Sequence, residues 1–246
     1  MGVVTMQNYD DSFKSVLIKS VTMNKGNELT NELRFDRDRE YWNQYYLSKE
    51  GQISKPSGFA EFISQYLNPN KCLLELGCGN GRDSIYFLNL GLKVIGIDAS
   101  DYIIKRLQHE FNDNHNADFI YDDFVQYRPN DKMKFDYVYS RFTLHAISEL
   151  QEDILLKNIR EYVEDDGIFF IEARTVKDSL YGKGVCVNKN AFIYDKHYRR
   201  FIDANEFKLK LKIMNYEIIF FEEKTGFSKT EYSDPVLMRC IARLKK

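Results

Sequence analysis

The stretch LLELGCGNGRDS, residues 73–84, decides how the rest of the chain is interpreted. Its apolar start predicts a short β-strand, three glycines follow within five positions, and the polar end is typical of a helix start. Gly77, Gly79 and Gly81 suit a backbone that approaches a ligand closely, and the start of a helix presents free N–H groups to it. We therefore predict a ligand-binding loop, with a tight turn of an ordinary α/β protein as the alternative.

Asp98 ends the next predicted strand, KVIGID, and follows Gly77 by 21 residues. A carboxylate at this position can accept hydrogen bonds from both ribose hydroxyls of a nucleotide-like cofactor. An aspartate at the end of a strand is also a common turn residue, so the argument depends on its spacing from the glycine loop. The sequence predicts that Asp98 and its neighbour Ala99 lie at a cofactor site.

The glycine spacing GxGxG departs from the GxGxxG fingerprint of dinucleotide-binding proteins. With an acidic residue two positions before the first glycine, the segment resembles the class I S-adenosylmethionine-dependent methyltransferases. Residues 77–100 look especially like the small-molecule branch that contains the tellurite-resistance and thiopurine methyltransferases. The resemblance covers about residues 38–246 and implies S-adenosyl-L-methionine as the cofactor. It implies that the loop around the methionine half of this cofactor includes Glu75, Gly77, Gly79 and Gly81.

The same resemblance implies further cofactor contacts after the third and fourth strands. The segment DFIYDDF ends in Asp122, Asp123 and Phe124. Asp123 is expected to offer its carboxylate to the adenine amino group, and Phe124 is expected to contact the ring. A solvated turn is the alternative for these residues. Ser140, which ends the fourth strand, is also expected at the cofactor.

Apolar runs alternate with amphipathic stretches from Lys71 onward, which is typical of an α/β fold with a parallel sheet. Near the C-terminus, YEIIFFEE and PVLMRCIARL predict two strands of an antiparallel hairpin. We expect a Rossmann-like, seven-stranded, mostly parallel sheet whose last strand is antiparallel. Helices are expected on both of its faces.

Residues 1–35 show no sustained apolar period and are predicted to form an N-terminal arm that is partly disordered, whereas residues 36–246 form one methyltransferase domain. The aromatic cluster of residues 41–46 predicts a helix at the start of this domain. It either packs as a stripe on the sheet or forms a helical lid that excludes water from the sulfonium. Tyr46 is predicted to place its hydroxyl in the pocket.

The acceptor is expected beyond the carboxyl ends of the strands, where ligands of open α/β sheets bind. Arginines after the fourth and fifth strands and in the following insertion predict an anion site, because guanidinium groups bind oxyanions through two parallel hydrogen bonds. A structural ion pair is the alternative for Arg141, and a packing role is the alternative for His145. The candidate acceptor-site residues are Tyr46, Arg141, His145, Arg174, Arg199 and Arg200.

The composition excludes several classes of protein. The 246 residues include 35 Lys and Arg against 37 Asp and Glu, a net charge of -2 that argues against a surface coated by nucleic acid. SRFT, residues 140–143, replaces the Asn/Asp-Pro-Pro-aromatic motif of amino-methylating DNA enzymes, and none of the four cysteines follows proline as in cytosine C5 methylation. With no long apolar run, secretion signal or CxxC pair, we expect a cytoplasmic protein without membrane, nucleic-acid or metal partners.

These observations predict in-line methyl transfer from S-adenosylmethionine to oxygen or nitrogen of a small molecule. We expect the acceptor to bear a phosphate, phosphonate or carboxylate. A protein or RNA methyltransferase and a non-catalytic cofactor-binding module are the alternatives. The sequence leaves the oligomeric state open.

Overall fold

The structure is a computed structural model of the chain, and it describes residues 39–48, 55–130, 133–195 and 197–245. The predicted N-terminal arm, residues 1–35, lies outside these ranges. Among the described residues, no helix is long and apolar enough to cross a membrane. The same part of the chain contains no group of three or more His, Cys, Asp or Glu side chains that could hold a metal ion.

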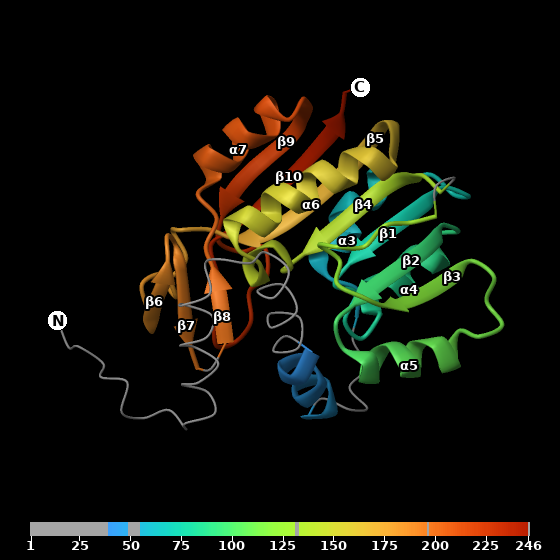
Figure 1. Cartoon of the computed structure of the whole chain (residues 1–246), viewed down its shortest axis with the longest axis horizontal. Coiled ribbons are helices and arrows are strands. Elements are labelled where there is room, and N and C mark those ends of the chain that lie inside the picture. The colour runs from blue at the N-terminus through green and yellow to red at the C-terminus, as the bar shows by residue number, and fades with distance from the viewer. Residues whose placement is uncertain (1–38, 49–54, 131–132, 196, 246) are drawn as a thin grey trace.

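A seven-stranded sheet forms the centre of the molecule, in the order β3-β2-β1-β4-β5-β10-β9 (Figure 1). The neighbouring pairs from β3 to β5 are parallel, and β10 runs antiparallel to both β5 and β9. The predicted Rossmann-like sheet with an antiparallel last strand is therefore confirmed. Its strands are β1 (Cys72–Leu76), β2 (Lys93–Asp98), β3 (Ala117–Tyr121), β4 (Phe135–Arg141), β5 (Val163–Arg174), β9 (Tyr216–Lys224) and β10 (Leu237–Leu244).

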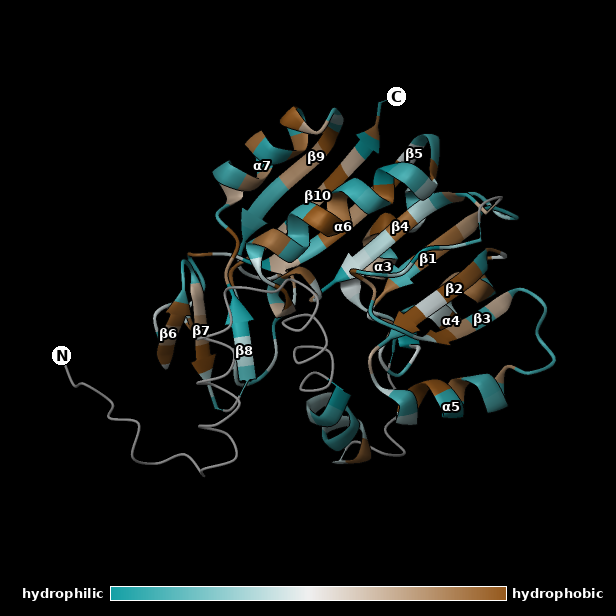
Figure 2. Cartoon of the chain, in the orientation of Figure 1, coloured by the Kyte–Doolittle hydropathy of each residue, from teal (hydrophilic) through white to brown (hydrophobic). Residues whose placement is uncertain are grey.

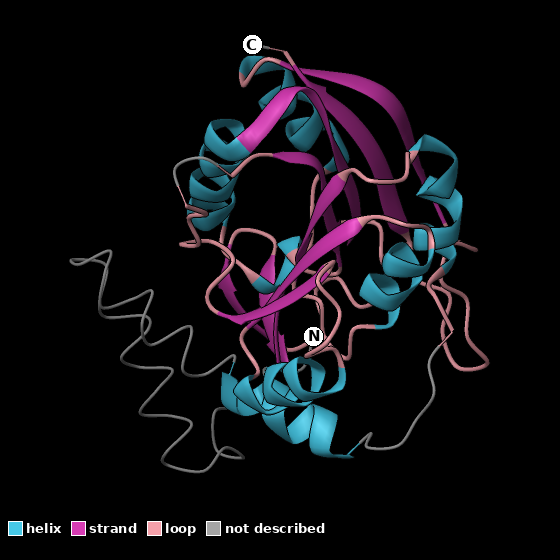
Figure 3. Cartoon of the chain, turned by 90° about the vertical axis from the view of Figure 1, so that its right-hand side faces the viewer, coloured by secondary structure: helices cyan, strands magenta, loops and turns pink. Residues whose placement is uncertain are grey.

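Helices cover both faces of this sheet, as predicted (Figure 3). Besides the helix of residues 39–48, they are α3 (Gly58–Ile63), α4 (Arg82–Asn89), α5 (Asp101–Glu110), α6 (Glu149–Tyr162) and α7 (Ala204–Ile213), with short 3₁₀ turns η2 (Ser64–Tyr66) and η3 (Leu144–Ala146). A capping box starts α6, because Ser148 and Gln151 each accept a backbone N–H hydrogen bond from the other residue. Asp203 caps α7 by accepting from the N–H groups of Asn205 and Glu206.

The apolar run of β1 is explained by burial on both faces of the sheet. Successive side chains of a strand point to opposite faces. Leu73 packs in the cluster that includes α3 and α4 residues, whereas Leu74 and Leu76 pack in the cluster that includes α6 and α7 residues. Figure 2 shows the corresponding division on α6, which carries both hydrophobic and hydrophilic residues. The buried sheet therefore holds the carboxyl ends of β1, β2 and β4 in fixed positions.

A second sheet occupies the insertion between β5 and α7. It is antiparallel, in the order β6-β7-β8, and consists of β6 (Val185–Asn188), β7 (Ala191–Tyr194) and β8 (His197–Arg200). Figure 1 shows it apart from the main sheet, beyond the C-terminal end of β5. The sequence predicts an insertion here but not this sheet, whose strands are only four residues long.

Candidate active site

The glycine loop follows β1 and turns the chain into α4. All three glycines have positive φ angles, +67° at Gly77, +55° at Gly79 and +77° at Gly81. A Cβ atom at Gly77 would lie 2.4 Å from Thr143 Cγ2, and one at Gly79 would lie 2.4 Å from Tyr46 Oη. Both the backbone angles and the surrounding space therefore require glycine.

Asp98 joins this loop to the end of β2. Its carboxylate accepts hydrogen bonds from the backbone N–H of Gly79 at 2.8 Å and from that of Ser100 at 2.9 Å. Burial raises the pKa of Asp98 to about 6, although these N–H groups act in the opposite direction. The buried carboxylate of Asp98 thus stabilises the conformation of the glycine loop through these hydrogen bonds.

Two further buried acidic residues, Glu75 and Asp83, connect the segment around the glycine loop to neighbouring elements. Glu75 accepts a hydrogen bond from the Ser84 hydroxyl of α4. Asp83 accepts from the backbone N–H and the hydroxyl of Ser57 and from the hydroxyl of Tyr139, at 2.7 to 2.8 Å. Burial, together with the charge of Asp83, raises the pKa of Glu75 well above its usual value. These contacts attach the start of α4 to β1 and β4.

One cavity of about 480 Å³ brings together most of the predicted cofactor residues with two of the predicted acceptor residues. Its lining includes Glu75, Gly77, Gly79, Asp98, Ala99, Asp123, Phe124, Tyr46 and Arg141. Gly81 and Ser140 are not part of this lining. Gly81 precedes the first turn of α4, and the buried Ser140 hydroxyl is hydrogen-bonded to Thr143. The arrangement offers a carboxylate for hydroxyl groups and an aromatic side chain for a flat base, as a nucleoside-bearing cofactor requires.

The helix of residues 39–48 forms one wall of the cavity through Trp42, Tyr45 and Tyr46. Asn43 attaches this helix to the start of α5, because its amide donates to Asp101 at 2.8 Å and accepts from the Ser100 hydroxyl at 2.5 Å. Figure 1 shows the helix, in blue, beyond the end of the sheet to which the arrow of β4 points. Tyr46, whose hydroxyl is predicted to lie in the pocket, is one of the residues that line this cavity.

Arg141 lies at the other side of the cavity, at the end of β4. Its Nε donates to Glu172 Oε1 at 2.9 Å, so the anticipated ion pair exists, yet the same side chain lines the cavity. The guanidinium carbon lies 4.2 Å from the ring centroid of Phe142. Phe142 has a φ of 60°, which is unusual for a bulky residue and typical of strained functional sites.

His145 and Arg174 contact Phe142 but do not line the cavity. The His145 ring lies 5.5 Å from that of Phe142, and Arg174 forms an ion pair with Asp178 at 2.8 Å. Burial lowers the pKa of His145 well below its usual value, and the charges of Arg174, His197 and two further arginines act in the same direction. A neutral, buried His145 is a weak candidate for a general base.

The predicted grouping of Arg199 with Arg200 needs correction. They are successive residues of β8, so their side chains point to opposite sides. Arg199 donates to the carbonyl of Tyr194 at 3.1 Å. Arg200 is buried, donates to the carbonyls of Ile147 and Leu144, and forms an ion pair with Glu152. Neither residue lines the cavity.

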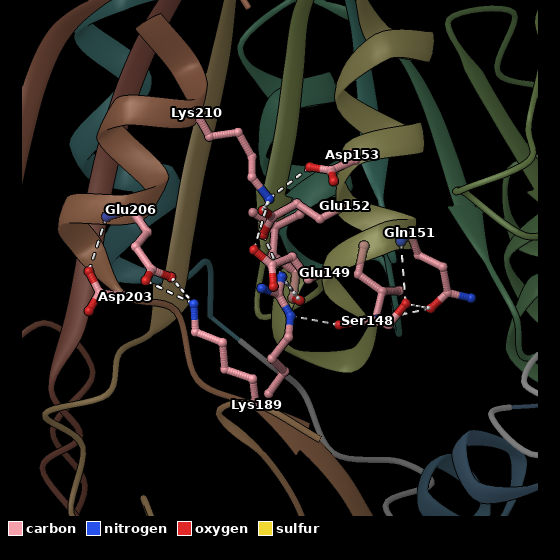
Figure 4. Close-up of polar contacts among 12 residues, drawn as sticks. Ser148, Glu149, Gln151, Glu152, Asp153, Lys189, Asp203, Glu206 and Lys210 are labelled. Atoms are coloured by element: carbon pink, nitrogen blue, oxygen red, sulfur yellow. Dashed lines mark hydrogen bonds and ion pairs between the residues drawn. The ribbon is translucent and has the colours of Figure 1, made fainter. Parts of the chain in front are cut away.

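Lys210 also forms ion pairs with Glu152 and with Asp153 (Figure 4). Arg200 therefore belongs to a buried ionic network between β8, α6 and α7. Its contacts are structural, and we do not include it in the acceptor site.

Several lining residues were not predicted from the sequence. Ser228 and Thr230 come from the loop between β9 and β10, Arg82 and Arg106 come from α4 and α5, and Thr143 lies between β4 and η3. Thr143 lies three residues after Ser140, the predicted end of the fourth strand, and this proximity is a usable signal. No local pattern distinguishes Ser228, because its position depends on contacts with residues far away in the sequence.

Comparison with known proteins identifies the family of the chain. The family profile described as a methyltransferase domain matches residues 48–219. Among curated proteins, the chain is 24% identical over 125 residues to the carboxy-S-adenosyl-L-methionine synthase of Helicobacter pylori (strain Shi470), covering 48% of this chain and 50% of that protein. It is 23% identical over 155 residues to the synthase of the same name from Nautilia profundicola, covering 62% of this chain and 63% of that protein. The chain thus spans half to two thirds of the length of these relatives.

Solved structures share the fold at low sequence identity. The 1,6-didemethyltoxoflavin-N1-methyltransferase of Burkholderia thailandensis superposes with a TM-score of 0.67 and 16% identity, over 91% of this chain and 92% of that one. TehB from Haemophilus influenzae superposes with a TM-score of 0.61 and 20% identity, over 83% of this chain and 67% of that one. Since the family profile covers well over half of the chain, the chain belongs to the family described as a methyltransferase domain.

Proposed function

We propose that this enzyme transfers the methyl group of S-adenosylmethionine to oxygen or nitrogen of a small molecule that bears an anionic group. One observation carries the proposal: Arg141 lines the same cavity as the glycine loop and Asp98. A guanidinium group that faces a cofactor cavity suits a phosphate, phosphonate or carboxylate on the acceptor.

The residues around the glycine loop suit the cofactor. The backbone of Gly77 and Gly79 would receive the methionine half, and Asp98 would accept from the ribose hydroxyls. Ala99 and Phe124 would contact the adenine ring, with Asp123 near its amino group. Bound S-adenosylmethionine supplies a methyl group already activated by its sulfonium charge. The chain's own residues then need to align the acceptor and exclude water.

Two titratable groups near the predicted acceptor site, Tyr46 and His145, favour an acceptor that is already deprotonated. Burial, with the charge of Asp98, raises the pKa of the Tyr46 hydroxyl well above its usual value. Burial lowers the pKa of His145 well below its usual value, which makes its imidazole a weak proton acceptor. Neither group is suited to remove a proton near pH 7, whereas an oxyanion needs no base.

The relatives support a small-molecule acceptor and suggest one competing product. The Burkholderia thailandensis structure contains 1,6-didemethyltoxoflavin and S-adenosylhomocysteine. The two curated relatives described above are named for the synthesis of carboxy-S-adenosyl-L-methionine, a modified form of the cofactor. A screen of small acceptors should therefore record both S-adenosylhomocysteine release and the masses of all products. Methylated anionic acceptors support the proposal, whereas methylation of neutral molecules alone, or modification of S-adenosylmethionine itself, would overturn it.

Replacing Arg141 with glutamine is expected to raise the acceptor KM about 10- to 100-fold. The reason is that a hydrogen bond to a charged group contributes about 1.5–3 kcal/mol. The affinity for S-adenosylhomocysteine should stay unchanged, because Arg141 is assigned to the acceptor. Steady-state kinetics on the acceptor found in the screen, with calorimetry of S-adenosylhomocysteine binding, separates the two effects. An unchanged KM would favour a neutral acceptor.

Cofactor affinity is expected to fall as the pH decreases through about 6, where Asp98 takes up a proton. A protonated carboxyl accepts hydrogen bonds from the ribose more weakly than a carboxylate does. The loss should approach at most about tenfold per pH unit below the pKa, and affinity should be constant above it. Calorimetry of S-adenosylhomocysteine binding between about pH 5 and 8 measures this effect. Asp98→Asn is the control, since its affinity should not change across this range.

A further inference from the structure

The loop between β9 and β10, residues 225–236, borders the cavity and is held by an ionic network centred on Glu172. The Glu172 side chain is fully buried on β5. Its Oε1 accepts from Arg141 Nε at 2.9 Å, and its Oε2 accepts from Arg239 Nε at 2.7 Å. One carboxylate therefore orients two arginines from the neighbouring strands β4 and β10.

Each of these arginines contacts one of two successive residues of the loop. Arg239 Nη2 donates to the carbonyl of Phe227 at 3.3 Å, and its guanidinium carbon lies 4.1 Å from the Phe227 ring centroid. Arg141 Nη2 donates to the Ser228 hydroxyl at 3.2 Å. The network thus fixes the backbone at residue 227 and the side chain at residue 228.

The Ser228 hydroxyl lines the cavity next to Arg141. Because its oxygen accepts from Arg141, its own hydrogen can be donated to a ligand. Arg141 uses Nε and one hydrogen of Nη2 in these contacts, which leaves further N–H groups of its guanidinium as donors at the cavity that Arg141 lines. The result is a pair of donors held at one side of the cavity, which suits an oxyanion.

We propose that the β9–β10 loop determines the specificity for the acceptor, with Ser228 and Arg141 binding its anionic group and Glu172 acting as the positioning residue for both. This inference rests on the proposed function and adds a binding site for the anion. The aromatic side chains of Trp42, Tyr45 and Phe142 in the cavity lining favour an acceptor whose anionic group is attached to a flat or aromatic body.

Phenyl phosphate titrated into the protein saturated with S-adenosylhomocysteine tests this site. Trp42 is the only tryptophan of the chain and lines the cavity, so its fluorescence reports binding. Ser228→Ala should weaken phenyl phosphate about tenfold, as expected for one hydrogen bond to a charged group. Ser233→Ala, the same change in the same loop outside the cavity lining, should bind like the wild type. Both variants should retain wild-type affinity for S-adenosylhomocysteine.

Amide hydrogen exchange of residues 225–230 tests the positioning role, because Glu172→Gln should accelerate exchange in this loop. A thermal melt confirms that the variant is folded, and Ser228→Ala remains informative if it is not. Unchanged phenyl phosphate binding by Ser228→Ala, or no binding by the wild type, would overturn the inference. Neither result would affect the proposed methyl transfer, which fails only if the acceptor screen yields no methylated anionic product.

Discussion

Gly79→Ala is expected to lower the affinity for S-adenosylmethionine more than about tenfold. The left-handed conformation of this residue, with φ at +55°, costs an alanine about 1–2 kcal/mol. The added Cβ would also lie 2.4 Å from Tyr46 Oη, so the tyrosine must leave its position in the cavity wall. Displacement of the loop would further disturb the hydrogen bond from Gly79 to Asp98. Together these effects exceed the free energy that corresponds to a tenfold change in affinity.

Equilibrium dialysis with labelled S-adenosylmethionine measures this loss. Gly182→Ala is the matched control, because Gly182 has a φ of +78° but nothing lies within 4 Å of the position of its Cβ. The control should lose some stability but keep its cofactor affinity. Wild-type affinity in Gly79→Ala would show that the loop does not approach the cofactor as proposed.

Arg200→Ala is expected to destabilise the protein by about 3–5 kcal/mol, the usual effect of removing one partner from a buried ion pair. The substitution removes the guanidinium that contacts Glu152 and the carbonyls of Ile147 and Leu144. Lys210 would remain as the partner of Glu152, which favours the lower end of this range. The melting temperature should fall by about 10 °C.

Arg199→Ala is the control, since this neighbouring residue makes one hydrogen bond to a backbone carbonyl. Thermal denaturation followed by circular dichroism compares the two variants. Equal melting temperatures would mean that the network around Glu152 contributes little to stability. They would contradict the structural role assigned to Arg200.

The contrast between these arginines illustrates what the sequence predicts and what it does not. The alternation of strands and helices along the chain, the glycine loop and Asp98 follow from local patterns, because the polarity and spacing of neighbouring residues determine them. Arg199 and Arg200 are equivalent as sequence, and they separate only once the chain forms the short strand β8. The alternation of side chains along a strand would have distinguished them had this strand been predicted.

The anion site could not be predicted for a different reason. Glu172 lies 31 residues from Arg141 and 67 residues from Arg239 in the sequence, and the sheet brings them together by placing β5 between β4 and β10. Ser228 lies 87 residues from Arg141, in a loop whose own sequence contains no pattern that marks Ser228 as a binding residue. Such contacts depend on strand order and register, which a pattern of polarity does not specify.

Calorimetric titration of S-adenosylhomocysteine into the wild type and the Asp98→Ala variant is the most direct test of the central claim, that the cavity beside the glycine loop holds the cofactor. We predict that the wild type binds one molecule per chain and that Asp98→Ala binds at least about tenfold more weakly. Equal affinity in the two proteins, or no binding by the wild type, would contradict the claim.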